Sequence, residues 1–271
     1  MTARMVSYSQ NGEDVVLSRA FPQPMVGFYV DVGANDPVHD SVTKVFYDRG
    51  WRGINIEPVP SVYASIEAAR PEDVNLNVGV SDRAGTLTMH EFADASAVST
   101  FSPQLNEQWT GMGYTSVTRD VPVVTLSAIF EEHVGDRVVD FLKVDVEGYE
   151  QQVFEGFDLR RWRPRVLVAE QNYHETWEPA VTACGYTRVL YDGLNYFFVR
   201  DEDLDALAPA FSRPASVALD AFDPWHYIRQ LEAASATINE LRSELDAARS
   251  VQAAPPARRS PLDALRRRAG G

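Results

Sequence analysis

The sequence predicts an α/β protein with a doubly wound, mostly parallel sheet. Short β-branched runs alternate with helical patterns through residues 1–205, and the runs are apolar almost throughout, as in strands covered on both faces. The strand candidates are 28–32 (FYVDV), 53–57 (GINIE), 74–80 (VNLNVGV), 138–146 (VVDFLKVDV) and 166–170 (VLVAE). Residues 186–200, YTRVLYDGLNYFFVR, surround an Asp-Gly turn signal and predict an antiparallel finish to the sheet. Ligands on such sheets bind beyond the carboxyl ends of the strands.

Helical patterns separate these strands, and one long segment has no clear pattern. The helix candidates are 41–49 (SVTKVFYDR), 60–69, 125–134 and 148–157. The alternating run TLTMHEF at 86–92 is typical of an extra hairpin arm. Residues 93–120 are polar and aromatic, with little helix or strand pattern, and loops of this length are usually functional or disordered. Trp109 and Tyr114 in this segment are candidates for stacking on a sugar.

The composition excludes several classes of protein. The chain has 271 residues, enough for one large α/β domain with an appendage, and 45% of them are hydrophobic. Its 39 acidic and 25 basic residues give a net charge of −14, which argues against a nucleic-acid binder because phosphate contacts need a basic surface. Cys184 stands alone and cannot form an internal disulfide. The N-terminus lacks the apolar core of a signal peptide and no stretch is long enough to span a bilayer, so we expect a cytoplasmic protein, not an integral membrane protein.

The loop after the first strand, DVGAND at 31–36, is built to approach a ligand. Gly33 follows the strand directly and permits a tight turn with close backbone approach. A single glycine is not the three-glycine dinucleotide fingerprint, and Asp31 and Asp36 would repel a pyrophosphate. The loop therefore favours a cationic ligand, or one made of sugar and base.

Two further strand ends support a nucleoside ligand. Glu57 ends the second strand, where nucleotide-binding folds place a carboxylate on ribose hydroxyls. The third strand runs into Ser81 and Asp82, a natural position for groups that contact an adenine. Together these features indicate an adenosine-type ligand without a pyrophosphate, and S-adenosyl-L-methionine (SAM) is the obvious one.

Five motifs occur in order along most of the chain, covering about residues 7–200. They are YSQNGEDVVL at 8–17, FYVDVGAND at 28–36, GWRGINIEP at 50–58, NVGVSD at 77–82 and FLKVDVEGYE at 141–150. In these motifs the sequence resembles the FkbM-type SAM-dependent methyltransferases. The resemblance implies the class I methyltransferase fold, a Rossmann-like seven-stranded sheet with a reversed last strand. It also implies O-methylation of a hydroxyl group, often on a sugar of a glycan or glycosylated natural product.

The resemblance carries roles onto individual residues. It implies that Asp31, Gly33, Ala34 and Asn35 form the SAM loop and that Glu57 binds the ribose hydroxyls. It also implies that Ser81 and Asp82 lie near the adenine. Residues 37–41 (PVHDS) depart from the family pattern because they are bulkier than the small residues common there, which leaves open how the methionine end is held.

Methyl transfer to a hydroxyl requires alignment of the reacting atoms and a base or metal that takes or weakens the proton. Asp145 ends the fourth strand and is a candidate for this role. Glu147, two residues on, either orients the substrate or braces the turn. Glu150 is expected to oppose the dipole of the following helix, and Lys143 to pair with a neighbouring carboxylate.

The end of the fifth strand supplies further candidates. Glu170 ends the strand, and His174 in the following loop is the best general-base candidate because histidine titrates near neutral pH. His39, directly after the SAM loop, is the second choice. In an alternative arrangement Asp145 and Glu170 hold Mg²⁺ through oxygen ligands, and the metal acidifies the acceptor hydroxyl.

The remainder of the chain reads as an appendage. Residues 206–226 contain three prolines and predict a connector, whereas 227–250 form an amphipathic or coiled-coil helix. Its apolar seam consists of Leu231, Ala234, Ile238, Leu241, Leu245 and Ala248. The seam predicts either a homodimer contact or packing on its own domain. Residues 251–271 form a basic tail that we expect to be disordered.

Two alternatives to an O-methyltransferase acting on a small-molecule or glycan acceptor remain open at this point. A nicotinamide-dependent oxidoreductase would use the same sheet edge, although the single-glycine loop and its acids disfavour a pyrophosphate. A non-catalytic SAM-fold scaffold would use the C-terminal helix for assembly, although the intact acids at the strand ends disfavour it.

Overall fold

A computed structural model describes residues 4–92, 95–171 and 176–253. The chain divides into two compact units, Met1–Trp225 and His226–Gly271. The first unit is an α/β domain and contains the candidate site. The second contains most of one long helix, α11 (Trp225–Ala253).

The centre of the first unit is a seven-stranded sheet in the order β10-β11-β9-β8-β2-β3-β4. Its strands are β2 (Phe28–Val32), β3 (Arg52–Ile56), β4 (Val74–Leu76), β8 (Phe141–Val144), β9 (Val166–Glu170), β10 (Tyr186–Tyr191) and β11 (Asn195–Arg200). The pairs from β4 to β9 are parallel, and β11 runs antiparallel to both β9 and β10. The prediction of an α/β fold with a mostly parallel sheet is confirmed.

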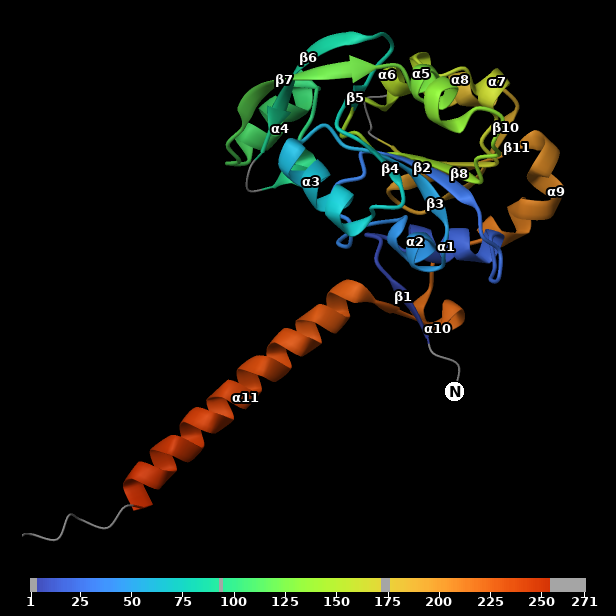
Figure 1. The fold of residues 1–271 in the computed structure, drawn as a ribbon. Coiled ribbons are helices and arrows are strands. Elements are labelled where there is room, and N and C mark those ends of the chain that lie inside the picture. The colour runs from blue at the N-terminus through green and yellow to red at the C-terminus, as the bar shows by residue number, and fades with distance from the viewer. Residues whose placement is uncertain (1–3, 93–94, 172–175, 254–271) are drawn as a thin grey trace, which may run out of the picture. The chain divides into compact units, whose positions relative to one another are not determined.

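Helices cover both faces of this sheet (Figure 1). On one face lie α5 (Leu126–Ile129), the π-helical turn η2 (Phe130–Val134), α6 (Glu150–Glu155), α7 (Leu159–Trp162) and α8 (Glu178–Thr182). On the other lie α1 (Glu13–Ala20), α2 (Lys44–Asp48), α9 (Leu204–Leu207) and the 3-10 turn η4 (Ala208–Phe211). Helix α3 (Pro60–Ala69) joins β3 to β4.

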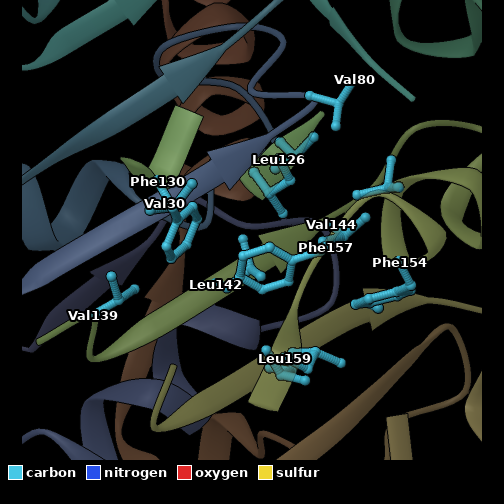
Figure 2. Packing of buried hydrophobic residues seen from close by; sticks show 14 of the residues in the cluster. Val30, Val80, Leu126, Phe130, Val139, Leu142, Val144, Phe154, Phe157 and Leu159 are labelled. Carbon is cyan, nitrogen blue, oxygen red and sulfur yellow. The ribbon is translucent and has the colours of Figure 1, made fainter. Parts of the chain in front are cut away.

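Each face of the sheet has its own hydrophobic core, because successive side chains of a strand point to opposite faces. Figure 2 shows the first core, in which Val30 and Leu142 of the sheet meet Phe130, Phe154 and Phe157. The second core collects the alternate sheet residues, including Tyr29 and Phe141, against α1, α2 and η4. The near-continuous apolarity of these strands is therefore explained by burial on both sides.

Smaller elements complete the domain. β5 (Gly79–Val80), β7 (Val117–Val124) and β6 (Gly85–Glu91) form a second sheet in that order, and β1 (Met5–Ser7) pairs with β12 (Phe222–Pro224). The remaining helices are the 3-10 turns η1 (Ser96–Val98) and η3 (Asp201–Asp203) and the α-helices α4 (Pro103–Gly111) and α10 (Val217–Asp220). The expected hairpin arm at 86–92 corresponds to β6, which pairs antiparallel with β7.

Two expectations from the sequence need correction. The predicted strand 74–80 is divided between β4 and β5, because the Asn77 amide donates to the carbonyl oxygens of Glu57 (2.8 Å) and Pro58 (3.1 Å) and turns the chain. The segment 93–120 contains more regular structure than its composition suggested. Helix α4 starts there with Pro103 in its first turn, after the Ser102 hydroxyl cap that accepts from the Leu105 amide.

The predicted connector at 206–226 includes η4, α10 and β12. Leu207, Phe211 and Phe222 are buried, so this stretch packs on the first unit up to Trp225. The proposed division at 205/206 stays a prediction. Most of the predicted basic tail, residues 254–271, lies outside the described residues.

The second core depends on one aromatic side chain, which gives a stability test. Phe141 is fully buried, and its ring lies 4.9 Å from Phe46, 5.7 Å from Tyr29 and 5.9 Å from Trp51, measured between ring centroids. We predict that Phe141→Ala lowers the free energy of unfolding by about 3–5 kcal/mol in urea titrations, because the cavity cannot collapse among rigid rings. Val138→Ala, at an exposed position nearby in sequence, should change it little. Equal effects of the two variants would contradict this description of the core.

Candidate active site

The loop after β2 is closed against the ends of two neighbouring strands. Gly33 has a φ of 78°, and a β-carbon there would overlap the carbonyl oxygen of Asp145 at the end of β8. The amides of Gly33 and Ala34 donate to the carbonyl oxygen of Ile56, at 3.0 and 3.1 Å. A side chain at position 33 would therefore separate the loop from β8, so the glycine is required by both its φ and the close approach.

Glu57 holds the other side of this loop. Its carboxylate accepts from the amide of Asn35 (3.0 Å) and from the amide of Val59 (2.8 Å), so one side chain joins the loops after β2 and β3. Burial raises the pKa of Glu57 to about 7, although these amides and Lys143 oppose the shift. Glu57 also lines the cleft described below, so it combines a structural role with a position in the cleft wall.

Lys143 lies behind the loop and binds both sides of it. Its ammonium donates to the carbonyl oxygen of Gly33 (3.0 Å) and lies 3.4 Å from Asp31 and 3.3 Å from Asp145. Burial disfavours the charged ammonium, but the two carboxylates outweigh it and raise the pKa of Lys143. The expectation that Lys143 pairs with a carboxylate is confirmed.

A cleft with about 550 Å³ of empty space, part of it open to solvent, lies in front of this loop. Five of the residues selected from the sequence line it, namely Gly33, Asn35, Glu57, Asp145 and Glu147. Apolar side chains form much of the remaining wall, namely Ile56, Val59, Val78, Val80, Met89 and Phe101. A few polar groups in an apolar wall are typical of small-molecule sites.

Other residues selected from the sequence lie off this wall. Ser81 is buried and its hydroxyl donates to Asp82 (2.9 Å), while its carbonyl group packs against Gly156. Asp31 is buried behind the loop, where it accepts from the Thr43 hydroxyl at 2.9 Å. Neither Ser81 nor Asp82 is among the lining residues, so their contact with an adenine stays a prediction.

A group of carboxylates lies where β8 and β9 end. Oxygen atoms of Asp145, Glu150 and Glu170 all lie within 4.8 Å of one another. Glu150 is fully buried and accepts from the amide of Val146 (2.8 Å), so it braces the turn between β8 and α6. Carboxylate oxygens are the ligands that Mg²⁺ prefers, and this group therefore has the donor type that the metal hypothesis needs.

Glu147 stands on the turn between Asp145 and α6 in a left-handed backbone conformation, with φ at 53°. The Thr100 hydroxyl donates to its carbonyl oxygen (2.6 Å), which ties the turn to the segment after η1. Burial raises the pKa of Glu147 to about 9, with further contributions from Asp145 and Glu170. This shift favours the protonated form of its carboxyl group, which can donate a hydrogen bond.

A polar pair that sequence reasoning did not select lies beside this group. Glu13, at the start of α1, is buried and accepts from the Asn195 amide (2.7 Å) and from the backbone amide of Asn11 (2.9 Å). Asn195 is the partner of Glu170 in the β11–β9 register, so the pair borders the same end of the sheet. Burial raises the pKa of Glu13 to about 7. In the sequence, Glu13 lies in the motif YSQNGEDVVL, which contributes to the family resemblance but does not by itself indicate a place in the site.

Of the histidine and aromatic candidates, the described ones are not among the residues that line the cleft. His174 falls within 172–175, outside the described residues. His39 is exposed, with its Nδ1 2.8 Å from Asp40, and is not among the residues that line the cleft. Trp109 and Tyr114 pack edge to face on each other at 5.8 Å.

The described residues therefore form a cleft beyond the ends of the parallel strands, bordered by a glycine loop and a group of acids, and ligands of doubly wound sheets bind at this place. The chain belongs to the FkbM methyltransferase domain family, whose profile matches residues 31–188. It is similar to "Methyltransferase sdnD" of Sordaria araneosa, with 28% identity over 187 residues that cover 58% of this chain and 69% of the relative. Among the described residues, no helix combines the length and apolarity needed to cross a membrane.

The raised pKa of Glu147 makes a prediction about stability. Between its ordinary pKa of 4.5 and about 9 the folded protein retains a proton that the unfolded chain releases, so this group lowers stability as pH rises through that window. We predict that Glu147→Gln gains stability relative to the parent protein between pH 5 and pH 9, measured by urea unfolding at both values. Glu107→Gln, at an exposed position, is the matched control. If the stability difference between Glu147→Gln and the parent protein is the same at pH 5 and pH 9, Glu147 is ionised in the folded state and the prediction is wrong.

Proposed function

We propose that this protein is a SAM-dependent O-methyltransferase that transfers a methyl group to a hydroxyl of a small molecule or glycan. The acceptor that we favour is a sugar of a glycan or glycosylated natural product. Family membership supports methyl transfer, and the strand order fits the class I methyltransferase arrangement. The observation that carries the proposal is the β2 loop, closed on Glu57 on one side and on Asp145 on the other.

The chemistry of the cleft suits SAM. When bound, SAM supplies a methyl group on a positively charged sulfonium. The apolar side chains of Val59, Val80 and Phe101 offer a wall for a flat base, and Glu57 offers carboxylate oxygens to ribose hydroxyls. Asp145 lies in the same cleft, and its carboxylate favours a cation over a pyrophosphate.

Three described carboxyl groups divide the remaining work in this proposal. Asp145 takes the proton of the attacking hydroxyl, and Lys143 fixes its orientation. Glu147, in its protonated form, donates a hydrogen bond that orients the acceptor. As the bond from the oxygen to the methyl carbon forms and the bond to sulfur breaks, positive charge develops on the attacking oxygen until Asp145 takes the proton. Glu170 stabilises this charge, and His174 stays an alternative base. If Mg²⁺ takes part, Asp145, Glu150 and Glu170 would hold it and it would acidify the hydroxyl.

Binding of the donor tests the first half of the proposal. We expect calorimetric titration to detect binding of SAM and of its demethylated product, and none of NADH. Ala97 is exposed and lines the cleft, so Ala97→Trp should fill the cleft and abolish SAM binding without lowering the melting temperature. Ala97→Ser is the matched control and should bind SAM as the parent does. Absence of SAM binding to the parent protein, or preferential binding of NADH, would refute the proposal.

Turnover tests the second half. A glycan extract incubated with the protein and SAM should contain species heavier by one methylene group in mass spectra. We predict that Asp145→Asn reduces their formation by about 10²–10⁴-fold because the general base is lost, while calorimetry still detects SAM binding. Asp136→Asn, an exposed acid remote from the cleft lining, is the control. Full turnover by Asp145→Asn would assign the base to His174 or Glu170, and a loss on adding chelator would indicate a metal.

A further inference from the structure

The C-terminal unit has one seam of apolar side chains along α11. Between residues 229 and 250 the large aliphatic residues are Leu231, Ile238, Leu241 and Leu245. With Ala234 included, their spacings alternate between three and four residues, which is the pattern of a and d positions in a heptad repeat. Every large aliphatic residue in this part of the helix therefore falls on the same seam.

These side chains are exposed to solvent. The exposed fractions are 69% for Leu231, 49% for Ile238, 58% for Leu241 and 50% for Leu245. Burial of apolar surface contributes about 25 cal/mol per Å², and single helices without packing are only marginally stable in water. The seam is consequently a surface that gains stability from a partner.

The width of the seam indicates what kind of partner fits. A helix that lies on a globular domain usually presents a broad apolar stripe that includes e or g positions. Between residues 229 and 250 the e and g positions are all polar, namely Gln230, Ser235, Thr237, Arg242, Glu244 and Arg249, and the apolar exceptions in α11 are Ile228 at e and Val251 at g, near its two ends. A stripe restricted to a and d is the seam of a coiled coil. In the central heptad Ile238 at a with Leu241 at d is the combination that favours two strands, while the flanking heptads have leucine at a and alanine at d.

We propose that α11 pairs with α11 of a second copy of this chain as a parallel, in-register coiled coil. One pair of opposite charges favours this orientation. Glu244 is at a g position and Arg249 at the following e position, and a parallel pair places each Glu244 against Arg249 of the partner. In an antiparallel pair g faces g and e faces e, so these opposite charges do not meet.

The oligomeric state of the full chain tests the pairing. We expect analytical ultracentrifugation to find a concentration-dependent dimer, and Ile238→Asp to convert it to a monomer because a charge enters the seam. Asn239→Asp adds the same charge at the next residue, outside the seam, and should leave the dimer intact. Circular dichroism of both variants separates lost pairing from an unfolded domain. A monomeric parent, or a dimer that survives Ile238→Asp, would overturn the proposal.

Disulfide trapping tests the orientation. In a Cys184→Ser background, which removes the single native cysteine, Leu245→Cys should give a covalent dimer on mild oxidation, because equal a positions face each other in a parallel pair. Ser243→Cys, on the outer face of the same pair, should remain monomeric on a denaturing gel. Failure of Leu245→Cys to cross-link in a protein that dimerises, or equal cross-linking of both variants, would exclude the parallel register.

Discussion

The architecture of the candidate site depends on the buried ammonium of Lys143. β2 and β8 are neighbours, and Lys143 is the register partner of Asp31. An ammonium has three donors, and here its partners are the Gly33 carbonyl and the carboxylates of Asp31 and Asp145. Without this ammonium, the carboxylates of Asp31 and Asp145 would lie near each other with no cation between them, beside the Gly33 loop that packs on the β8 backbone. Removing one partner of such a buried group is costly because the remaining charges are left uncompensated.

The same network extends from Lys143 into the body of the domain. Asp31 accepts from Thr43, and the buried guanidinium of Arg70 donates to the Thr43 hydroxyl at 2.5 Å. Arg70 also donates to the carbonyl oxygen of Pro37 (2.8 Å) and to the Ser41 hydroxyl (2.6 Å). The bulkier segment 37–41 is thus held by a side chain that follows α3. The position of the loop after β2 is therefore set by Lys143 of β8 and by Arg70 after α3, and not by the loop alone.

The limits of sequence reasoning follow from the range of the interactions. Gly33, Glu57 and Asp145 could be placed together from the sequence, because parallel strands end at one edge of a sheet. The contact between Glu13 and Asn195 joins residues 182 positions apart and exists only because antiparallel β11 begins beside the end of β9. The break in the predicted strand 74–80 depends on tertiary hydrogen bonds of Asn77, which no local pattern encodes. Sequence patterns therefore predict which residues end the strands. Which residues surround those strand ends could be learned only from the structure.

Several carboxyl groups of the site have raised pKa values. Burial raises the pKa of Glu57 and Glu13 to about 7 and that of Glu147 to about 9, so the site retains protons that exposed carboxyl groups would lose. Lys143 is the cation that the structure places between Asp31 and Asp145, and it lies behind the loop and not in the cleft. A positively charged ligand in the cleft would stabilise the ionised forms and lower these pKa values, so ligand binding and proton release are linked. Under the proposed function the sulfonium of SAM fulfils this condition, whereas a pyrophosphate would raise the same pKa values further.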